Sequence, residues 1–125
     1  MQLHNNNKTT LVIGASLKEE RFSNICIKTL VAENIPVHAI GILSGTVAGV
    51  QVQTGFPDIS GIHTVSLYIT PENQKLMYNY IIGLHPERVV FNPGTENPEL
   101  KSLLALGGIL AVEDCTLMMV EGGRF

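Results

Sequence analysis

The chain has 125 residues and a formal net charge of −3; 45% of its residues are hydrophobic and 15% are charged. This length suits one domain with a buried core, and this composition excludes a disordered chain. The eight lysines and arginines are scattered and no apolar run is long enough to span a bilayer, which argues against nucleic-acid and membrane partners.

Residues 1–8 include three successive asparagines and are expected to form a flexible N-terminus, followed by a single domain over residues 9–125. The apolar run 11–14 lacks polar alternation, which predicts a strand buried on both faces. Apolar residues at three- and four-residue spacings then predict a helix. Ser23 is expected to cap its start, and Asn34 to end it in a left-handed conformation.

A second buried strand is expected over residues 35–42, a short edge strand around 50–52 and a third core strand over 64–69. Thr70-Pro71-Glu72 then supplies a capping hydroxyl, a proline at the first helical position and an acid in the first turn. This pattern predicts a helix that runs to about residue 85.

A fourth strand is expected near 88–91, a helix between Asn97-Pro98-Glu99 and Gly107-Gly108, and a fifth strand over 109–112. Each return between parallel strands needs a crossover helix, so this alternation predicts an α/β fold with a parallel sheet covered on both faces. The apolar residues 117–120 suit packing either on this sheet or on a second subunit.

In an open parallel sheet, ligands bind beyond the carboxyl ends of the strands. The first strand ends in Gly14, Ala15 and Ser16, where a glycine permits close backbone approach and the next helix presents unpaired N–H groups to an anion. Arg21 near that helix start is suited to fork onto a phosphate, with Lys18 as a second charge. From spacing alone, a tight strand-to-helix turn explains this pattern equally well.

Two further strand ends would face the same crevice, at Thr70-Pro71 and at Asn92-Pro93-Gly94. They are suited to flank a base or ribose, although spacing alone favours simple helix caps. The full dinucleotide fingerprint is absent, because the later glycines after Gly14 are missing and residues 39–43 hold no acid for a ribose. Both gaps weigh against NAD.

Short motifs from about residue 9 onward have a characteristic order and spacing: Val12-Ile13-Gly14-Ala15-Ser16, Arg21-Phe22-Ser23, Ile35-Pro36-Val37, Gly49-Val50-Gln51-Val52, Pro57-Asp58-Ile59, Asn92-Pro93-Gly94 and Asp114-Cys115. Together they resemble the CoA-binding domain family of small stand-alone proteins. These proteins are similar to the nucleotide-binding domain of the succinyl-CoA synthetase alpha subunit.

The resemblance implies a Rossmann-like, doubly wound parallel sheet of about five strands, with a cleft for CoA, acyl-CoA or a related adenine nucleotide. It also implies contacts by position: with phosphates for Gly14, Ala15, Ser16 and Arg21; at the adenosine end for Gly41, Thr70 and Pro71; and on the far side for Asn92 and Gly94.

Three functions remain open at this point: a binding module without catalysis of its own, a small enzyme with Cys115 or Ser16 as the reactive group, and a scaffold that works through protein contacts. The histidines have no metal-site spacing, and no nucleophile elbow occurs. Cys115 follows Asp114, whose charge opposes a reactive thiolate, so a buried structural cysteine is favoured. The acidic pair Glu19-Glu20 keeps the scaffold interpretation open.

The two cysteines, Cys26 and Cys115, form neither a disulfide framework nor a Cys-x-x-Cys motif, and no signal peptide is visible. These features indicate a cytoplasmic protein. The expected partner is a small nucleotide ligand, and a homo-oligomer or a protein partner remains open.

Overall fold

The computed structural model describes residues 7–125, so most of the expected flexible segment 1–8 lies outside the described residues. The strands form one seven-stranded sheet with the order β3-β4-β2-β1-β5-β6-β7. All neighbours pair in parallel except β3 and β4. The strands are β1 (Thr10–Ala15), β2 (Val37–Gly41), β3 (Gly45–Val47), β4 (Val50–Gln53), β5 (Thr64–Leu67), β6 (Arg88–Phe91) and β7 (Leu110–Glu113).

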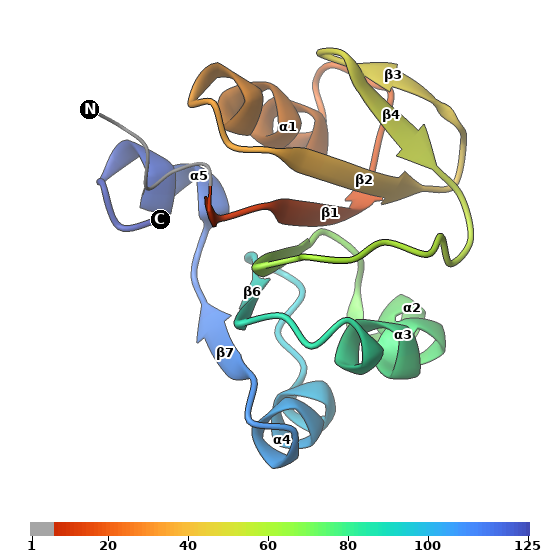
Figure 1. Cartoon of the computed structure of the whole chain (residues 1–125), viewed down its shortest axis with the longest axis vertical. Coiled ribbons are helices and arrows are strands. Elements are labelled where there is room, and N and C mark those ends of the chain that lie inside the picture. Colours follow the sequence, from red (N-terminus) through yellow and green to blue (C-terminus); the bar gives the residue numbers. More distant parts are fainter. Residues whose placement is uncertain (1–6) are drawn as a thin grey trace.

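The helices cover both faces of this sheet. Figure 1 shows α1 and α5 on one side, and α2, α3 and α4 on the other. The helical segments are α1 (Phe22–Ala32), α2 (Pro71–Gln74), the 3₁₀ turn η2 (Lys75–Met77), α3 (Tyr78–Gly83), α4 (Pro98–Leu106) and α5 (Thr116–Glu121). The predicted doubly wound α/β fold is therefore confirmed.

The sheet has more strands than the five or so that the sequence predicts. The segment around residues 50–52 was expected as an edge strand and does form β4, which pairs with β2. The edge itself is β3, which returns antiparallel against β4. Three residues that include a glycine give almost no strand signal of their own, so β3 depends on this hairpin pairing.

The central strand β1 is buried on both faces, as its continuous apolar run predicts. Leu11 and Val12 both have an exposed fraction of 0%. Leu11 and Ile13 belong to the core cluster beneath α3 and α4, whereas Val12 packs with Cys26 and other residues of the α1 face. Alternate side chains of one strand thus build the two cores of the molecule.

The ends of α1 agree with the sequence prediction at one terminus only. Asn34 has a φ of 62°, which confirms the left-handed position after the helix. The prediction that Ser23 caps the start is wrong, because Arg21 occupies the N-cap position and makes no side-chain cap hydrogen bond. Ser23 is a buried residue inside the helix instead.

The long helix expected after Thr70 is broken into α2, η2 and α3. A 3₁₀ turn places residues three apart on the same side, which lets Gln74 and Met77 both face the interior. Pro71 is at the predicted first helical position, but the Thr70 hydroxyl makes no cap hydrogen bond.

The C-terminal part of the chain has one helix that the sequence did not predict, α5. Its Leu117 and Val120 pack on the α1 face and Met119 is buried, whereas Met118 is 56% exposed. Most of the apolar segment 117–120 therefore packs on the chain's own sheet. Within residues 7–125, no helix has the length and apolar character that a bilayer crossing requires.

The N-terminus of α4 supplies a test of the capping predictions. Asn97 accepts hydrogen bonds from the backbone N–H groups of Glu99 and Leu100, at 3.1 and 3.2 Å. We expect Asn97→Ala to lower the free energy of unfolding by about 1–3 kcal/mol, because it removes the cap and also the Nδ2 donor to buried Gln74 Oε1. Thr70→Ala, which removes a hydroxyl that caps nothing, should change it by less than about 0.5 kcal/mol. Urea unfolding of both variants measures this difference, and equal losses would contradict it.

Candidate functional site

The carboxyl ends of β1 and β5 mark the point where the strand order reverses. From β1 the chain passes through α1 to β2 on one side, whereas β5 pairs with β1 on the other. Chain connections leave such a switch point in opposite directions, so no connection covers it and ligands commonly bind there. The residues that follow β1, β2, β5 and β6 meet at this edge.

Gly14 brings the end of β1 against the segment that follows β5. Its φ is +95°, a conformation that glycine adopts without cost. An added Cβ would lie 2.8 Å from Ile69 Cγ2 and 2.9 Å from the Tyr68 carbonyl carbon, too close for any side chain. Here the turn requires glycine.

Gly41 closes the other side of the same edge. It pairs with Ala15 after a register shift in β1, and an added Cβ would lie 2.3 Å from the Ala15 carbonyl oxygen. Four of the predicted site residues therefore lie where the ends of β1 and β2 pack closely: Gly14, Ala15, Ser16 and Gly41. This part of the edge offers a ligand mainly peptide groups.

Ser16 is held in place by two hydrogen bonds. Its Oγ accepts from the Lys18 backbone N–H at 3.1 Å, and its carbonyl oxygen accepts from Asn24 Nδ2 at 2.8 Å. Asn24 is 1% exposed, and its Oδ1 has no hydrogen-bond partner within the described residues. The hydroxyl proton of Ser16 stays available for an acceptor.

The start of α1 follows this turn after residues 17–21 and has unpaired donors. Within residues 7–125, the backbone N–H groups of Phe22 and Ser23 have no acceptor. Lys18 and Arg21 are both exposed, and neither makes an ion pair with another described residue. Two free N–H groups and two exposed cations therefore sit at the beginning of an eleven-residue helix.

The end of β2 has a different character. Ile42 and Leu43, which follow Gly41 directly, are 93% and 67% exposed. Neither supplies the carboxylate that would bind ribose hydroxyls in a dinucleotide site. This part of the edge is apolar, in contrast to the cationic segment before α1.

Thr70 and Pro71 follow Ile69, the residue that contacts Gly14. Thr70 is exposed, has extended backbone angles at the N-cap of α2 and leaves its hydroxyl without a cap hydrogen bond. Pro71 is half-buried at the first helical position. Both residues border the edge that Gly14 and Ala15 form.

Asn92 differs from the other predicted site residues, because its side chain is directed inward and 2% exposed. Its Nδ2 donates to Ser66 Oγ at 2.9 Å and to the Leu67 carbonyl oxygen at 2.7 Å. Its Oδ1 accepts from the Thr116 N–H at 2.8 Å. Both side-chain donors are therefore used inside the chain.

Gly94 lies in the exposed loop after β6, with a φ of +92°. Its backbone N–H donates to Glu96 Oε1 at 2.9 Å, and the space around its Cα is open. Gly94 is therefore at the surface, whereas Asn92, two residues earlier, is directed inward.

Cys26 belongs to the apolar core on the α1 face, and Cys115 precedes α5 on the same side of the sheet (Figure 1). Burial raises the pKa of the Cys26 thiol to about 11. Cys115 is half-buried, rather than buried as expected, at the N-cap of α5. Tyr68 lies beside Cys26; its hydroxyl has no partner within the described residues, and burial raises its pKa above the usual value.

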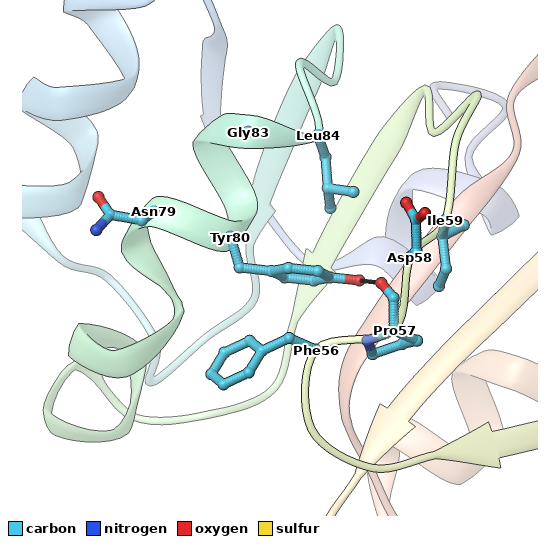
Figure 2. A pocket seen from close by; sticks show the side chains of 8 residues that line it. All are labelled: Phe56, Pro57, Asp58, Ile59, Asn79, Tyr80, Gly83 and Leu84. Carbon is cyan, nitrogen blue, oxygen red and sulfur yellow. Dashed lines mark hydrogen bonds between the residues drawn. The ribbon is translucent and has the colours of Figure 1, made fainter.

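A separate open hollow of about 370 Å³ lies between α3 and the segment that follows β4. Figure 2 shows the Tyr80 ring crossing this hollow, with its hydroxyl directed at the Pro57 carbonyl oxygen, to which it donates at 2.6 Å. The Phe56 ring packs against Tyr80 at a centroid distance of 5.5 Å. None of the ten predicted site residues lines this hollow.

Sequence reasoning missed the buried polar residues that support the edge, above all Gln74. Its exposed fraction is 0%. A signal was present, because Gln74, Met77 and Ile81 are spaced as one helix face and a glutamine on an apolar face needs internal partners. Asn24 gives a similar but weaker signal in α1.

The comparisons with known proteins agree with this architecture. The model of a family described as CoA binding domain matches residues 8–121. No curated protein matches the chain.

Solved structures cover almost the whole chain. A structure described as that of an uncharacterized protein has 42% identity over 94% of this chain and 98% of that chain, with a TM-score of 0.92. A hypothetical protein from Pyrococcus horikoshii OT3 has 25% identity over 96% and 85%, with a TM-score of 0.83. The protein cell-free ID.343 from Thermus thermophilus has 19% identity over 99% and 97%, with a TM-score of 0.82, and supports the fold alone.

The close approach at Gly41 gives a direct test of the edge. We expect Gly41→Ala to lower the free energy of unfolding by about 1–3 kcal/mol, because its Cβ would displace the Ala15 carbonyl. Gly83→Ala is the matched control, since a Cβ there meets nothing within 4 Å and alanine favours the helix. Urea unfolding compares the two, and a Gly41→Ala protein as stable as the control would contradict the packing described here.

Proposed function

The chain belongs to the CoA binding domain family, and from that premise we propose that it binds CoA, an acyl-CoA or a related adenine nucleotide at the carboxyl ends of β1 and β2. In this proposal the glycine-lined turn Gly14-Ala15-Ser16 lets the ligand approach the backbone. Lys18 and Arg21 contact its phosphates.

The observation that carries the proposal is the pair of unpaired N–H groups at the start of α1, a helix that Asn24 joins to the Gly14–Ser16 turn by a hydrogen bond to the Ser16 carbonyl oxygen. Helix N-termini of this kind favour anions, because the free N–H groups and the helix dipole act together. The half-buried Ser16 hydroxyl and the exposed Arg21 guanidinium add two further donors for phosphate oxygens.

The rest of the edge suits the non-phosphate parts of such a ligand. Gly41, Thr70 and Pro71 would border the adenosine, with the apolar Ile42 beside them. Gly94 would line the far side, and Asn92 would act there by fixing the loop, because its own donors are already used.

We propose binding without catalysis by this chain. The edge itself offers hydrogen-bond donors and tightly packed backbone. Cys115, the candidate reactive group, is at the start of a six-residue helix, and its N–H donates to the neighbouring Asp114 carboxylate, whose charge opposes a thiolate. Any reaction on the bound ligand would then be carried out by another protein. A cytoplasmic location fits a CoA ligand.

Ligand binding is tested by thermal unfolding of the purified protein with CoA, acetyl-CoA, ADP, ATP, NAD and NADP. A ligand at a hundred times its dissociation constant stabilises the folded state by about 2.7 kcal/mol. We expect this stabilisation with CoA and acetyl-CoA, and little with NAD. A shift with NAD alone would overturn the choice of ligand, and no shift with any of them would favour a scaffold that works through protein contacts.

The role of Arg21 is tested by substitution. Arg21→Ala should weaken CoA binding by about tenfold. The folded state should be unaffected, because the side chain is exposed and makes no cap hydrogen bond. Lys101→Ala is the control, since it removes the same charge from α4, where Lys101 pairs with Glu113. Isothermal titration gives both affinities, and equal affinities would remove Arg21 from the site.

A further inference from the structure

Gln74 is a buried side chain that joins three segments at the carboxyl edge of the sheet. Its Nε2 donates to the Ile69 carbonyl oxygen at 2.9 Å and to the Thr95 carbonyl oxygen at 2.8 Å. Its Oε1 accepts from Asn97 Nδ2 at 2.8 Å. One amide thus connects the loop after β5, the loop after β6 and the start of α4.

The Ile69 end of this connection reaches the turn after β1. Ile69 Cγ2 lies where a side chain at Gly14 would begin, so these two segments are in direct contact. The Tyr68 N–H also donates to the Ile13 carbonyl oxygen at 2.8 Å. A displacement of Ile69 would therefore shift the backbone at Gly14, in the turn that we propose to contact the ligand phosphates.

At its other end, Gln74 is bonded to Thr95 in the loop after β6, on the other side of β5 from the Gly14 turn. Thr95 Oγ1 and the Thr95 N–H both donate to the Asn92 carbonyl oxygen, at 2.7 and 3.0 Å. Asn92 in turn donates to the Leu67 carbonyl oxygen at the end of β5. The loop that carries Gly94 is therefore held from both ends.

Apart from its hydrogen-bond partners, Gln74 of α2 is followed by the buried core residues Met77 of η2 and Ile81 of α3, which are apolar. A methionine would fill nearly the same volume in such surroundings, so packing does not require a glutamine here. What the amide contributes is its set of directed hydrogen bonds, and in a buried site these fix geometry strongly.

We propose that Gln74 is a positioning residue that holds the loops after β5 and β6 at a fixed separation beside the Gly14 turn, so that the ligand cleft is formed before the ligand arrives. The part of this inference that concerns affinity rests on the proposed function. The part that concerns loop geometry does not.

The test compares Gln74→Met with Ile81→Val, a conservative change at another fully buried position, in α3. Amide hydrogen exchange is measured on both proteins without ligand. In Gln74→Met we expect protection at the Tyr68, Asn73 and Thr95 N–H groups to fall by about tenfold more than at the central β1 amides. In Ile81→Val any loss should be uniform across these amides.

Affinity for CoA is then measured by titration well below the unfolding temperature, where both variants are folded. Gln74→Met should bind about tenfold more weakly than the wild type, and Ile81→Val within about twofold. If Gln74→Met does not fold, Gln74→Leu supplies the same readouts, because it also removes the amide and introduces no buried charge.

The outcomes separate this inference from the proposed function. If the wild type binds no CoA, the proposed function fails, and the exchange experiment still decides whether Gln74 holds the loops. If Gln74→Met keeps both wild-type protection and wild-type affinity, or if Ile81→Val loses as much of each, the positioning role is overturned.

Discussion

The close backbone contact at the carboxyl end of β1 is the constraint on which the candidate site depends. Gly14 lies against the segment after β5, and Gly41 lies against the Ala15 carbonyl, at distances that leave no room for a Cβ. Because side chains are excluded there, the edge exposes peptide groups and the free N–H groups of α1. A ligand at this place would be recognised mainly by backbone donors, whose positions are fixed by the strands themselves.

Three buried side-chain amides hold the segments of this edge in place by hydrogen bonds. Asn24 holds the Ser16 carbonyl, Asn92 joins the ends of β5 and β6 to α5, and Gln74 connects the loops after β5 and β6. All three are buried, so their hydrogen bonds are protected from competition by water. The chain thus uses its internal polar groups to fix loops, while Lys18 and Arg21 stay exposed and make no ion pair with another described residue.

Local patterns were sufficient for the main strands and for the cap of α4, but not for the side-chain caps expected at Ser23 and Thr70. The run 11–14 gave β1, and Asn97-Pro98-Glu99 gave the start of α4. The sequence did not predict the antiparallel β3, which is stabilised by its hairpin partner β4. It also did not predict the short α5, which is stabilised by packing on the α1 face, distant in sequence. The turn of the candidate site was visible in Gly14-Ala15-Ser16. The role of Gln74 was not, because it depends on residues 69 and 95 meeting in space.

The acidic pair Glu19-Glu20 would repel an anion near the start of α1, but the positions of these two side chains weaken that repulsion. Both residues are exposed, and Glu19 lies 4.0 Å from Lys28 further along α1. Exposed charges are strongly screened by water and salt, so their repulsion falls off within a short distance. The unpaired N–H groups of Phe22 and Ser23 lie at the helix start itself. The unpaired N–H groups of α1 and the apolar Ile42 beyond β2 give the two ends of this edge different polarity, and the adenine nucleotide that we propose as ligand has the same division between its phosphates and its base.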